Sequence, residues 1–480
     1  MISTPSMIQS MHKQPMGKVR NIHFIGIGGV GMSGIAEVYH NLGFKVSGSD
    51  MSDSDTMKHL RKLGIKVYVG HAVDQIEDSH VVVTSTAIDK NNVEVYAARK
   101  LRIPVVRRAV MLAELMRFRQ GIAIAGTHGK TTTTSLVACI LAKGNLDPTY
   151  VIGGKLNSSA SHAKLGESNY LVAEADESDA SFLHLNPMIS IVTNIDQDHL
   201  STYGGDFERL KQTFIEFIHN LPFYGLAILC LDDSVTREII PKLARPVLTY
   251  GEADDADVRI SDIRPNGSRT KFNVHLPGQK KSVAMQLNMT GKHNALNSLA
   301  AIAVAWELGV THEAMQKALE SFEGIGRRFQ ISEQVPIKHG QVLHIDDYGH
   351  HPNEIKAALQ AARAAWPDRR LSVVFQPHRY TRTRDLFEDF VQVLSEPDQL
   401  ILLEVYPAGE AHIKDADGRS LSRAIRNRGQ IEPVFVEQLE QLPEVLENLL
   451  QDDDVFVTLG AGSIGAFAQQ FLQSAKGKEV

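Results

Sequence analysis

The chain has 480 residues, and at about 100–200 residues per domain this length predicts about three domains. Hydrophobic residues make up 43% of the sequence, which suits several buried cores and excludes a disordered chain. The 50 Lys and Arg residues against 56 Asp and Glu residues give a net charge of −6 without a long basic run. Nucleic acid and anionic membranes are therefore not expected as partners.

The N-terminal segment and the cysteines predict the compartment. Residues 1–17 are polar and contain proline, so we expect a flexible extension rather than a signal peptide. No window approaches the roughly 18 apolar residues of a membrane span. Cys139 and Cys230 lie in apolar patterns without metal-type spacing, which predicts two buried thiols. We therefore expect a soluble, cytoplasmic protein.

Short apolar strands alternate with helical patterns along nearly the whole chain. This order predicts an α/β fold with parallel sheets covered by helices. Strand "NIHFIGI" opens a Rossmann-like N-terminal domain, predicted at 18–120. Strand "GIAIAG" opens a central P-loop-type ATPase domain with a mostly parallel sheet, predicted at 121–330. Strand "QVLHIDDY" begins a Rossmann-like C-terminal domain, predicted at 331–480.

The stretch "GIAIAGTHGKTTTTS" has the strand–loop–helix context of a phosphate-binding loop. It is shortened, because Ile124 stands where such loops usually have their first glycine. The glycines let backbone N–H groups face an anion at a helix N-terminus, where the lysine reaches the β- and γ-phosphates and the following hydroxyl holds Mg²⁺. The ATP-binding residues expected here are Gly126, Thr127, His128, Gly129, Lys130, Thr131 and Thr132.

Two acidic clusters follow strands further along this domain. Glu174 lies in "YLVAEADESD", and Asp196, Asp198 and His199 end "ISIVTNIDQDH". Ligands collect at the carboxyl ends of parallel strands, and Mg²⁺ prefers oxygen ligands. Each cluster alone is compatible with a solvated loop, but the phosphate loop upstream favours a metal site.

Glycine patterns occur near both ends of the chain. Gly26, Gly28 and Gly31 form G-x-G-x-x-G after a strand, and Asp50 ends the next strand, which is a fair signal for a dinucleotide and leaves a dehydrogenase open. The second pattern, in "VTLGAGSIGAF", is followed by too little chain for another strand with a ribose-binding acid. We interpret it as close packing between a strand and a helix.

Five motifs in order carry a family resemblance: "GTHGKTTT", "EADESD", "NIDQDH", "GKHNALN" and "DDYGHHP". Together they resemble the Mur ligases, ATP-dependent amide-forming enzymes of peptidoglycan synthesis, and hence of cell-wall biogenesis, cell shape and cell division. The resemblance implies three domains, for a UDP-substrate, ATP and an amino acid. It also implies that ATP, with Mg²⁺ at two sites, phosphorylates a carboxylate, and that an amine then attacks the acyl phosphate and displaces phosphate. "GIGGVGMSGIAEV" is similar to the branch that joins L-alanine to UDP-N-acetylmuramate.

The resemblance also implies roles for individual residues. Lys130 and Thr131 would contact phosphates and one Mg²⁺, and Glu174 and His199 would hold a second Mg²⁺. The expected nucleotide-binding residues outside the loop are His293, Asn294, Arg328 and Asp347. The expected catalytic and amino-acid-site residues of the third domain are Tyr348, His350, His378, Arg379 and Arg382. The glycine loop would hold the diphosphate of the UDP-sugar, and the expected UDP-substrate residues are Gly26, Gly28, Gly29, Gly31, Ser49, Asp50 and Thr86.

Several alternatives remain open from the sequence. A ligase that recycles murein tripeptide onto the same UDP-sugar shares most of these motifs, although the first glycine loop argues against it. A folylpolyglutamate-type ligase would leave the first ~120 residues without a purpose, and a nucleotide switch would not need the His and Arg set of the third domain. Thr86 either lines the substrate cleft or belongs to a solvated loop. Lys211 is too close to "DQDH" to be assigned as a carbamylated lysine, and a monomer and a homodimer are both compatible with the sequence.

Overall fold

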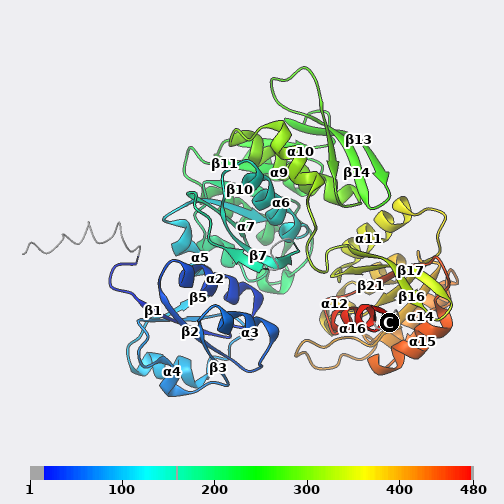
Figure 1. The fold of residues 1–480 in the computed structure, drawn as a ribbon, viewed down its shortest axis with the longest axis horizontal. Helices are drawn as coiled ribbons and strands as arrows, with labels where there is room; N and C mark the ends of the chain where they lie inside the picture. Colours follow the sequence, from blue (N-terminus) through cyan, green and yellow to red (C-terminus); the bar gives the residue numbers. More distant parts are fainter. Residues whose placement is uncertain (1–15, 158–160, 477–480) are drawn as a thin grey trace, which may run out of the picture. The chain divides into compact units, whose positions relative to one another are not determined.

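The computed structural model describes residues 16–157 and 161–476, so the predicted extension lies almost wholly outside the described residues. The chain forms three sheets, which confirms the predicted α/β class (Figure 1). Its contacts group it into two compact units. One runs to Ile260 and adds Val274–Val283 and Asn297–Leu319, and the other consists of Ser261–Asn273, Ala284–Leu296 and the chain from Glu320 onward.

The first sheet is entirely parallel, with the strand order β3-β2-β1-β4-β5. Helices follow most of its strands, as in other parallel sheets of this kind. Its helices and strands are β1 (Asn21–Ile25), α2 (Val30–Asn41), β2 (Lys45–Asp50), α3 (Asp55–Lys62), β3 (Lys66–Val69), β4 (Val81–Thr84), α4 (Val93–Lys100), β5 (Val105–Arg107) and α5 (Arg108–Met116).

The second sheet has ten strands in the order β15-β14-β13-β12-β11-β10-β6-β9-β7-β8. The pairings from β13 through to β7 are parallel, and β8 pairs with β7 in the antiparallel sense. The elements are β6 (Gln120–Ala125), α6 (Lys130–Lys143), β7 (Thr149–Leu156), β8 (Ser161–Lys164), β9 (Tyr170–Glu174), η2 (Ser181–His184), β10 (Ile189–Val192), η3 (Leu200–Tyr203), α7 (Phe207–His219), β11 (Leu226–Cys230), α8 (Ser234–Ile239), β12 (Val247–Gly251), β13 (Val258–Asn266), β14 (Arg269–His275), β15 (Val283–Leu287), α9 (Lys292–Glu307) and α10 (His312–Glu320).

One continuous core joins the first sheet to the parallel part of the second. Helix α2 packs on β7 and β8, and it approaches them closely because Gly34 has no side chain. A Cβ at Gly34 would lie only 3.3 Å from the Cβ of Ala163 and 3.4 Å from a methyl group of Val151. The hydroxyl of Tyr39 donates to the carbonyl of Met111 at 2.9 Å, which ties α2 to α5. These contacts keep the glycine loop after β1 beside the second sheet.

The third sheet has the order β16-β17-β21-β18-β19-β20, in which only β16 is antiparallel to its neighbour. Its strands are buried on both faces by two apolar clusters. The elements are β16 (Gln330–Ile337), β17 (Gly340–Asp347), α11 (Pro352–Ala365), β18 (Leu371–Phe375), α12 (Tyr380–Asp385), α13 (Phe387–Val393), β19 (Gln399–Leu403), α14 (Gly418–Arg428), β20 (Val434–Val436), α15 (Leu442–Leu449), β21 (Val455–Leu459) and α16 (Ile464–Lys476).

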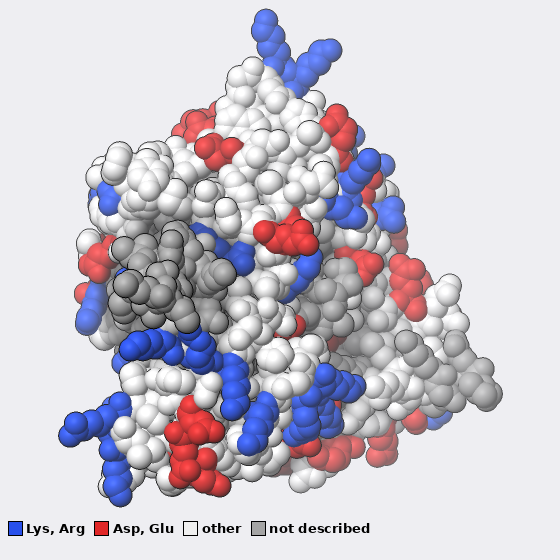
Figure 2. All heavy atoms as spheres, turned by 60° about the vertical axis from the view of Figure 1, so that its left-hand side comes forward, with Lys and Arg blue, Asp and Glu red and all other residues white. Residues whose placement is uncertain are grey.

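Three other predictions concern the surface charge, membrane-spanning helices and the burial of the two cysteines. Acidic and basic side chains are interspersed over the face drawn in Figure 2. Among the described helices, none combines the length and the apolarity needed to cross a bilayer. Cys230 is a buried thiol as predicted, whereas Cys139 is only partly buried.

Phe182 anchors the segment that follows β9. Its ring is fully buried, stacks on Phe217 at 4.8 Å and meets Phe214 edge-on at 5.2 Å. Phe182→Ala should lower the free energy of unfolding by about 3–5 kcal/mol, because it leaves a cavity in this core. Urea unfolding followed by circular dichroism measures the change. Tyr96, which is 67% exposed, is the control, and Tyr96→Ala should stay within about 0.5 kcal/mol; similar losses in both variants would contradict the anchoring role.

Candidate functional site

Three loops converge because β6 lies between β10 and β9. Ile124 of β6 is in register with Glu174 of β9, and Ala125 is in register with Val192 of β10. The carboxyl ends of all three strands therefore meet at one edge of the sheet. The phosphate loop follows β6 there, and the two acidic clusters predicted from the sequence follow its neighbours.

The phosphate loop is held in a conformation that only glycine adopts without strain. Gly126 and Gly129 have φ values of +128° and +82°. A Cβ at Gly126 would collide with the hydroxyl of Thr193, and one at Gly129 would lie 2.5 Å from Oδ1 of Asn297. Helix α6 begins at Lys130, so its free backbone N–H groups face this loop. This is the geometry of an anion site at a helix N-terminus.

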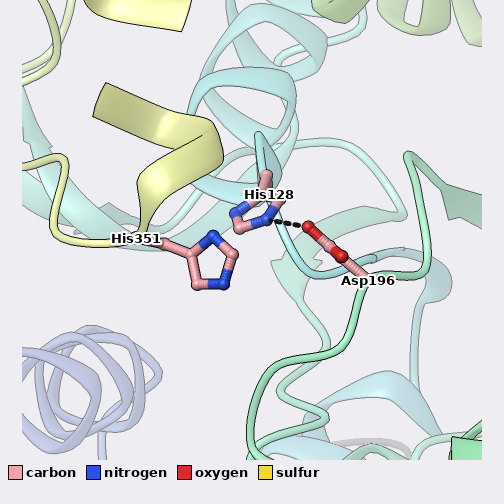
Figure 3. A group of neighbouring side chains, drawn as sticks. All are labelled: His128, Asp196 and His351. Atoms are coloured by element: carbon pink, nitrogen blue, oxygen red, sulfur yellow. Dashed lines mark hydrogen bonds and ion pairs between the residues drawn. The ribbon is translucent and has the colours of Figure 1, made fainter. Parts of the chain in front are cut away.

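The loop after β10 clamps the phosphate loop from one side. Oδ1 of Asn194 accepts from the backbone N–H of His128 at 2.9 Å, and Oγ1 of Thr127 accepts from the backbone N–H of Asp196 at 2.9 Å. Nε2 of His128 lies 3.0 Å from Oδ2 of Asp196 (Figure 3). His351, which the same view labels, caps helix α11 by accepting from the backbone N–H of Asn353 at 3.3 Å.

The ammonium group of Lys130 is engaged by the protein. It donates to both carboxylate oxygens of Glu177, at 2.7 and 2.8 Å, and to the carbonyls of Gly126 and Thr127, at 2.6 and 3.2 Å. Burial lowers the pKa of Lys130, but the charge and hydrogen bonds of Glu177, together with the charges of Asp176 and Glu174, outweigh it and the pKa is raised. Lys130 is therefore a cation at neutral pH.

The residues expected at the metal sites lie at the start of α6, at the end of β9 and in the loop after β10. Thr131 is buried at the start of α6. Oε1 of Glu174 accepts from the backbone N–H of Gly153 at 2.7 Å. His199 adopts a left-handed conformation at φ +56° with Nε2 3.5 Å from Asp198. These hydroxyl and carboxylate donors suit Mg²⁺, which prefers oxygen ligands.

Lys211 serves as a structural cation on α7. Its ammonium lies 2.7 Å from Oε1 of Glu208 and 2.8 Å from Oε2 of Glu238. Both partners raise its pKa, which keeps it charged. Carbamylation requires a neutral amine, so this environment agrees with leaving Lys211 unassigned.

A cavity of about 530 Å³ connects the first glycine loop to the phosphate loop. Lys130, Glu174 and Asp176 line it on the side of the second sheet. On the side of the first sheet it is lined by Gly26, Gly29, Val30, Gly31, Met32, Asp50, Ser85, Thr86, Ala87, Ile88, Arg108 and Leu112. The structure thus brings most of the predicted UDP-substrate residues, Thr86 included, into one cleft with the phosphate-loop lysine. An extended anion bound on the glycine loop would reach Lys130.

Three predicted UDP-substrate residues make internal contacts. The backbone N–H of Gly28 donates to Oδ2 of Asp50 at 3.0 Å, which braces the glycine turn. Oγ of Ser49 is buried and donates to Oε2 of Glu94 at 2.6 Å, beside Nδ1 of His71 at 2.9 Å. The side chain of Ser49 therefore points into the first domain.

A second cluster of predicted residues surrounds the carboxyl end of β17. Asp347 accepts from the backbone N–H groups of Phe329 and Gly349, each at 2.7 Å. Burial raises the pKa of Asp347, and the guanidinium of Arg328 opposes this. The same guanidinium lies 5.0 Å from the ring centre of Tyr348, within cation–π range. Arg328, Asp347 and Tyr348 thus form one contact group.

His293, His350 and His378 of the second unit are neutral. The ring of His350 lies 5.4 Å from that of Tyr348 and 5.8 Å from that of His378. Burial lowers the pKa of His350 and of His378 to about 4 each, and Arg382 reinforces both shifts. Burial likewise lowers the pKa of His293 to about 4. Neutral imidazoles can accept a hydrogen bond from an incoming amine.

Arg379 and Asn294 occupy special backbone positions. Arg379 is exposed at φ +72°, and its backbone N–H donates to the carbonyl of Tyr406 at 2.9 Å. The adjacent His378 ring stacks on Tyr406 at 5.5 Å. The amide of Asn294 donates to the carbonyl of Thr290 at 2.8 Å, which fixes the start of α9.

Sequence reasoning missed three residues of the first unit. Arg108 lines the cavity, lies 3.0 Å from a Cβ built at Gly31, and pairs with Asp176 at 3.4 Å. Asn297 accepts from Oγ1 of Thr133 at 3.3 Å, beside the phosphate loop. Glu177 holds Lys130. The signals were present in "RRAVML", "GKHNALN" and "EADESD", but each contact joins segments far apart in sequence.

Three family models match the chain in order. They are the Mur ligase family, catalytic domain, over residues 21–120, the Mur ligase middle domain over residues 124–305, and the Mur ligase, glutamate ligase domain over residues 327–462. The chain therefore belongs to the Mur ligase family, and the resemblance seen in its motifs is confirmed.

Relatives with curated names and relatives with solved structures show which Mur ligases this chain is similar to. The UDP-N-acetylmuramate–L-alanine ligases of Halorhodospira halophila and Methylococcus capsulatus are 58% and 59% identical, each over 95% of this chain and 94% and 96% of their own. The crystal structure of the UDP-N-acetylmuramate-alanine ligase of Thermotoga maritima matches with a TM-score of 0.81 at 30% identity, over 95% of this chain and 99% of its own. A murein peptide ligase of Psychrobacter arcticus shares the fold, with a TM-score of 0.69 at 24% identity over 95% of this chain and 98% of its own.

The loop conformation generates a direct prediction. Gly129→Ala forces a left-handed alanine against Asn297, and such strain costs about 1–3 kcal/mol. We expect the affinity for a nonhydrolysable ATP analogue to fall at least about tenfold, as measured by calorimetry. Gly278→Ala is the matched control, because Gly278 has a φ of +74° with nothing within 4 Å of an added Cβ. Equal affinities in the two variants would contradict an anion site at this loop.

Proposed function

We propose that this protein is an ATP-dependent ligase that joins L-alanine to the lactyl carboxylate of UDP-N-acetylmuramate and releases ADP and phosphate. The reaction supplies a peptidoglycan precursor. The observation that carries the proposal is the cleft in which the first glycine loop, Lys130 and Glu174 meet. The two relatives that carry this activity in their names, at 58% and 59% identity over nearly full length, support it.

The UDP-sugar would lie along this cleft. The backbone N–H groups around Gly26, Gly29 and Gly31, at the start of α2, are suited to a diphosphate. Arg108 adds a cation at Gly31. The lactyl carboxylate would then lie toward Lys130 and Glu174, where the γ-phosphate of ATP is expected.

The phosphate loop would hold the nucleotide. Backbone N–H groups of Gly126–Thr132 would bind the β- and γ-phosphates, and Lys130 would move onto them. Thr131, Glu174 and His199 would hold Mg²⁺, which offsets the repulsion between the phosphate and the carboxylate. Asn297 would brace the loop through Thr133, as it does in this structure.

The second unit would bind the base end of the nucleotide and the amino acid. We assign Arg328, Asp347, His293 and Asn294 to the nucleotide. Arg379 and Arg382 would clamp the alanine carboxylate, because the planar guanidinium bonds both of its oxygens. Transfer of the γ-phosphoryl group of ATP to the lactyl carboxylate would give an acyl phosphate and ADP. His378 and His350, neutral at physiological pH, would accept hydrogen bonds from the amine of alanine. The amine would attack the acyl phosphate and expel phosphate.

Phosphate release from ATP and Mg²⁺ tests the proposal. We would supply UDP-N-acetylmuramate alone, then with L-alanine, then with a murein tripeptide instead. Sustained release that requires the UDP-sugar and L-alanine together is expected. Release with the tripeptide but not with L-alanine would identify a tripeptide ligase and overturn the assignment of the amino acid.

Lys130→Ala should abolish phosphate release, because the transferring phosphoryl group loses its nearest protein cation. Binding of UDP-N-acetylmuramate, measured by calorimetry, should persist, since the glycine loop after β1 is unchanged. Lys211→Ala is the control, because this lysine pairs with Glu208 and Glu238 of α7 and α8. Normal ATP turnover by Lys130→Ala would contradict the role of the loop.

A further inference from the structure

Glu177 is a buried carboxylate to which none of the roles above is assigned. Its side chain is 2% exposed, and it lies three residues beyond Glu174 in "EADESD". Both of its oxygens accept from Lys130, whose ammonium also donates to two loop carbonyls. An ammonium group has three N–H donors. The lysine assigned to the phosphates is therefore saturated by the protein when no nucleotide is bound.

We propose that Glu177 is a positioning residue that holds Lys130 away from the phosphate site until a nucleotide displaces it. The inference rests on the nucleotide-binding part of the proposed function. Lys130 cannot keep both oxygens of Glu177 and both carbonyls while it bonds phosphate oxygens. The charged phosphates form stronger bonds with an ammonium than neutral carbonyls do, so nucleotide binding exchanges one partner set for the other.

The backbone of Glu177 is held in place, which limits how far its side chain can follow the lysine. Its backbone carbonyl accepts from the hydroxyl of Tyr203 and from the N–H of Ala180 at 3.0 Å. The chain then enters the buried core through Phe182, whose N–H donates to the carbonyl of Asp176 at 3.1 Å. When Lys130 moves to the phosphates, the carboxylate stays behind without its cation.

The charges around Glu177 decide what happens next. Lys130 of α6 and Asp176 of its own segment are the charged groups acting on it, Tyr203 of η3 packs over it, and Arg108 of α5 pairs with Asp176. Burial raises the pKa of Glu177 to about 7 even with Lys130 opposing. Losing Lys130 raises this pKa further. Glu177 then takes up a proton from solvent and becomes a neutral carboxylic acid.

The direction of the pH dependence follows. Above about pH 7 the free protein carries Glu177 as a carboxylate, and nucleotide binding brings a proton in. Below that pH Glu177 is already protonated in the free protein, so uptake declines. Proton uptake should therefore be largest in mildly alkaline solution.

The experiment is calorimetric titration of the full chain with a nonhydrolysable ATP analogue and Mg²⁺ at pH 8, in two buffers of different ionisation enthalpy. Glu177→Gln keeps the shape of the side chain and removes its charge. We expect the wild type to take up as much as about one proton per nucleotide and Glu177→Gln to take up none. Glu177→Gln should also bind the analogue roughly three- to tenfold more tightly, because no ion pair has to be broken.

Glu238→Gln is the matched control. Oε2 of Glu238, on α8, forms an ion pair with the ammonium group of Lys211 at 2.8 Å. Glu238→Gln therefore also removes the carboxylate partner of a lysine, but of a different lysine, and should behave like the wild type. If Glu177→Gln fails to fold, the pH series of the wild type decides, since uptake must fall as the pH drops below about 7.

The outcomes separate the two proposals. Wild-type binding without proton uptake, or weaker binding by Glu177→Gln with uptake unchanged, would overturn the role of Glu177 while leaving the nucleotide site intact. Failure of both wild type and Glu177→Gln to bind the analogue would contradict the proposed function itself, and the inference would fall with it.

Discussion

The strand order β10-β6-β9 is the constraint on which the site of the first unit depends. It places the loop after β6 between the loops after β9 and β10, so the phosphate loop has a carboxylate-bearing segment on each side. Hydrogen bonds accepted by the side chains of Asn194 and Thr127 hold one flank, and the pair of Lys130 with Glu177 holds the other. The glycine loop of the first sheet reaches the same place because α2 packs directly on β7 and β8.

Electrostatic balance then explains the composition of the cleft. The reaction proposed here joins two anions, a nucleotide phosphate and a carboxylate, so it needs cations whose positions are set in advance. The cleft contains Lys130 and Arg108 among the carboxylates Asp50, Glu174 and Asp176. Such a mixture is unfavourable for binding phosphates directly and favourable for binding them together with Mg²⁺. Glu177 fits this balance as a partner that keeps the lysine ordered between turnovers.

The sequence predicted the parts of this site that depend on local order. The phosphate loop, the strands before "EADESD" and "NIDQDH", and the glycine turn with Asp50 all follow from strand–loop–helix patterns within about 30 residues. Contacts between residues far apart in the chain could not be predicted from the sequence. The partnership of Ser49 with Glu94 spans 45 residues, and the pair of Arg108 with Asp176 spans 68. Among the four acids of "EADESD", burial under Tyr203 and not the motif selects Glu177 as the partner of Lys130.

The central claim is that ATP activates the carboxylate of the UDP-sugar as an acyl phosphate. The most direct test is to supply UDP-N-acetylmuramate labelled with oxygen-18 in its lactyl carboxylate, together with ATP, Mg²⁺ and L-alanine, and to determine the isotope content of the released phosphate by mass spectrometry. Phosphoryl transfer to the carboxylate, followed by attack of the amine at the carbonyl carbon, leaves one carboxylate oxygen on the phosphate. The account therefore predicts one label in each phosphate released. Phosphate without label, formed at the same rate as the amide, would contradict it.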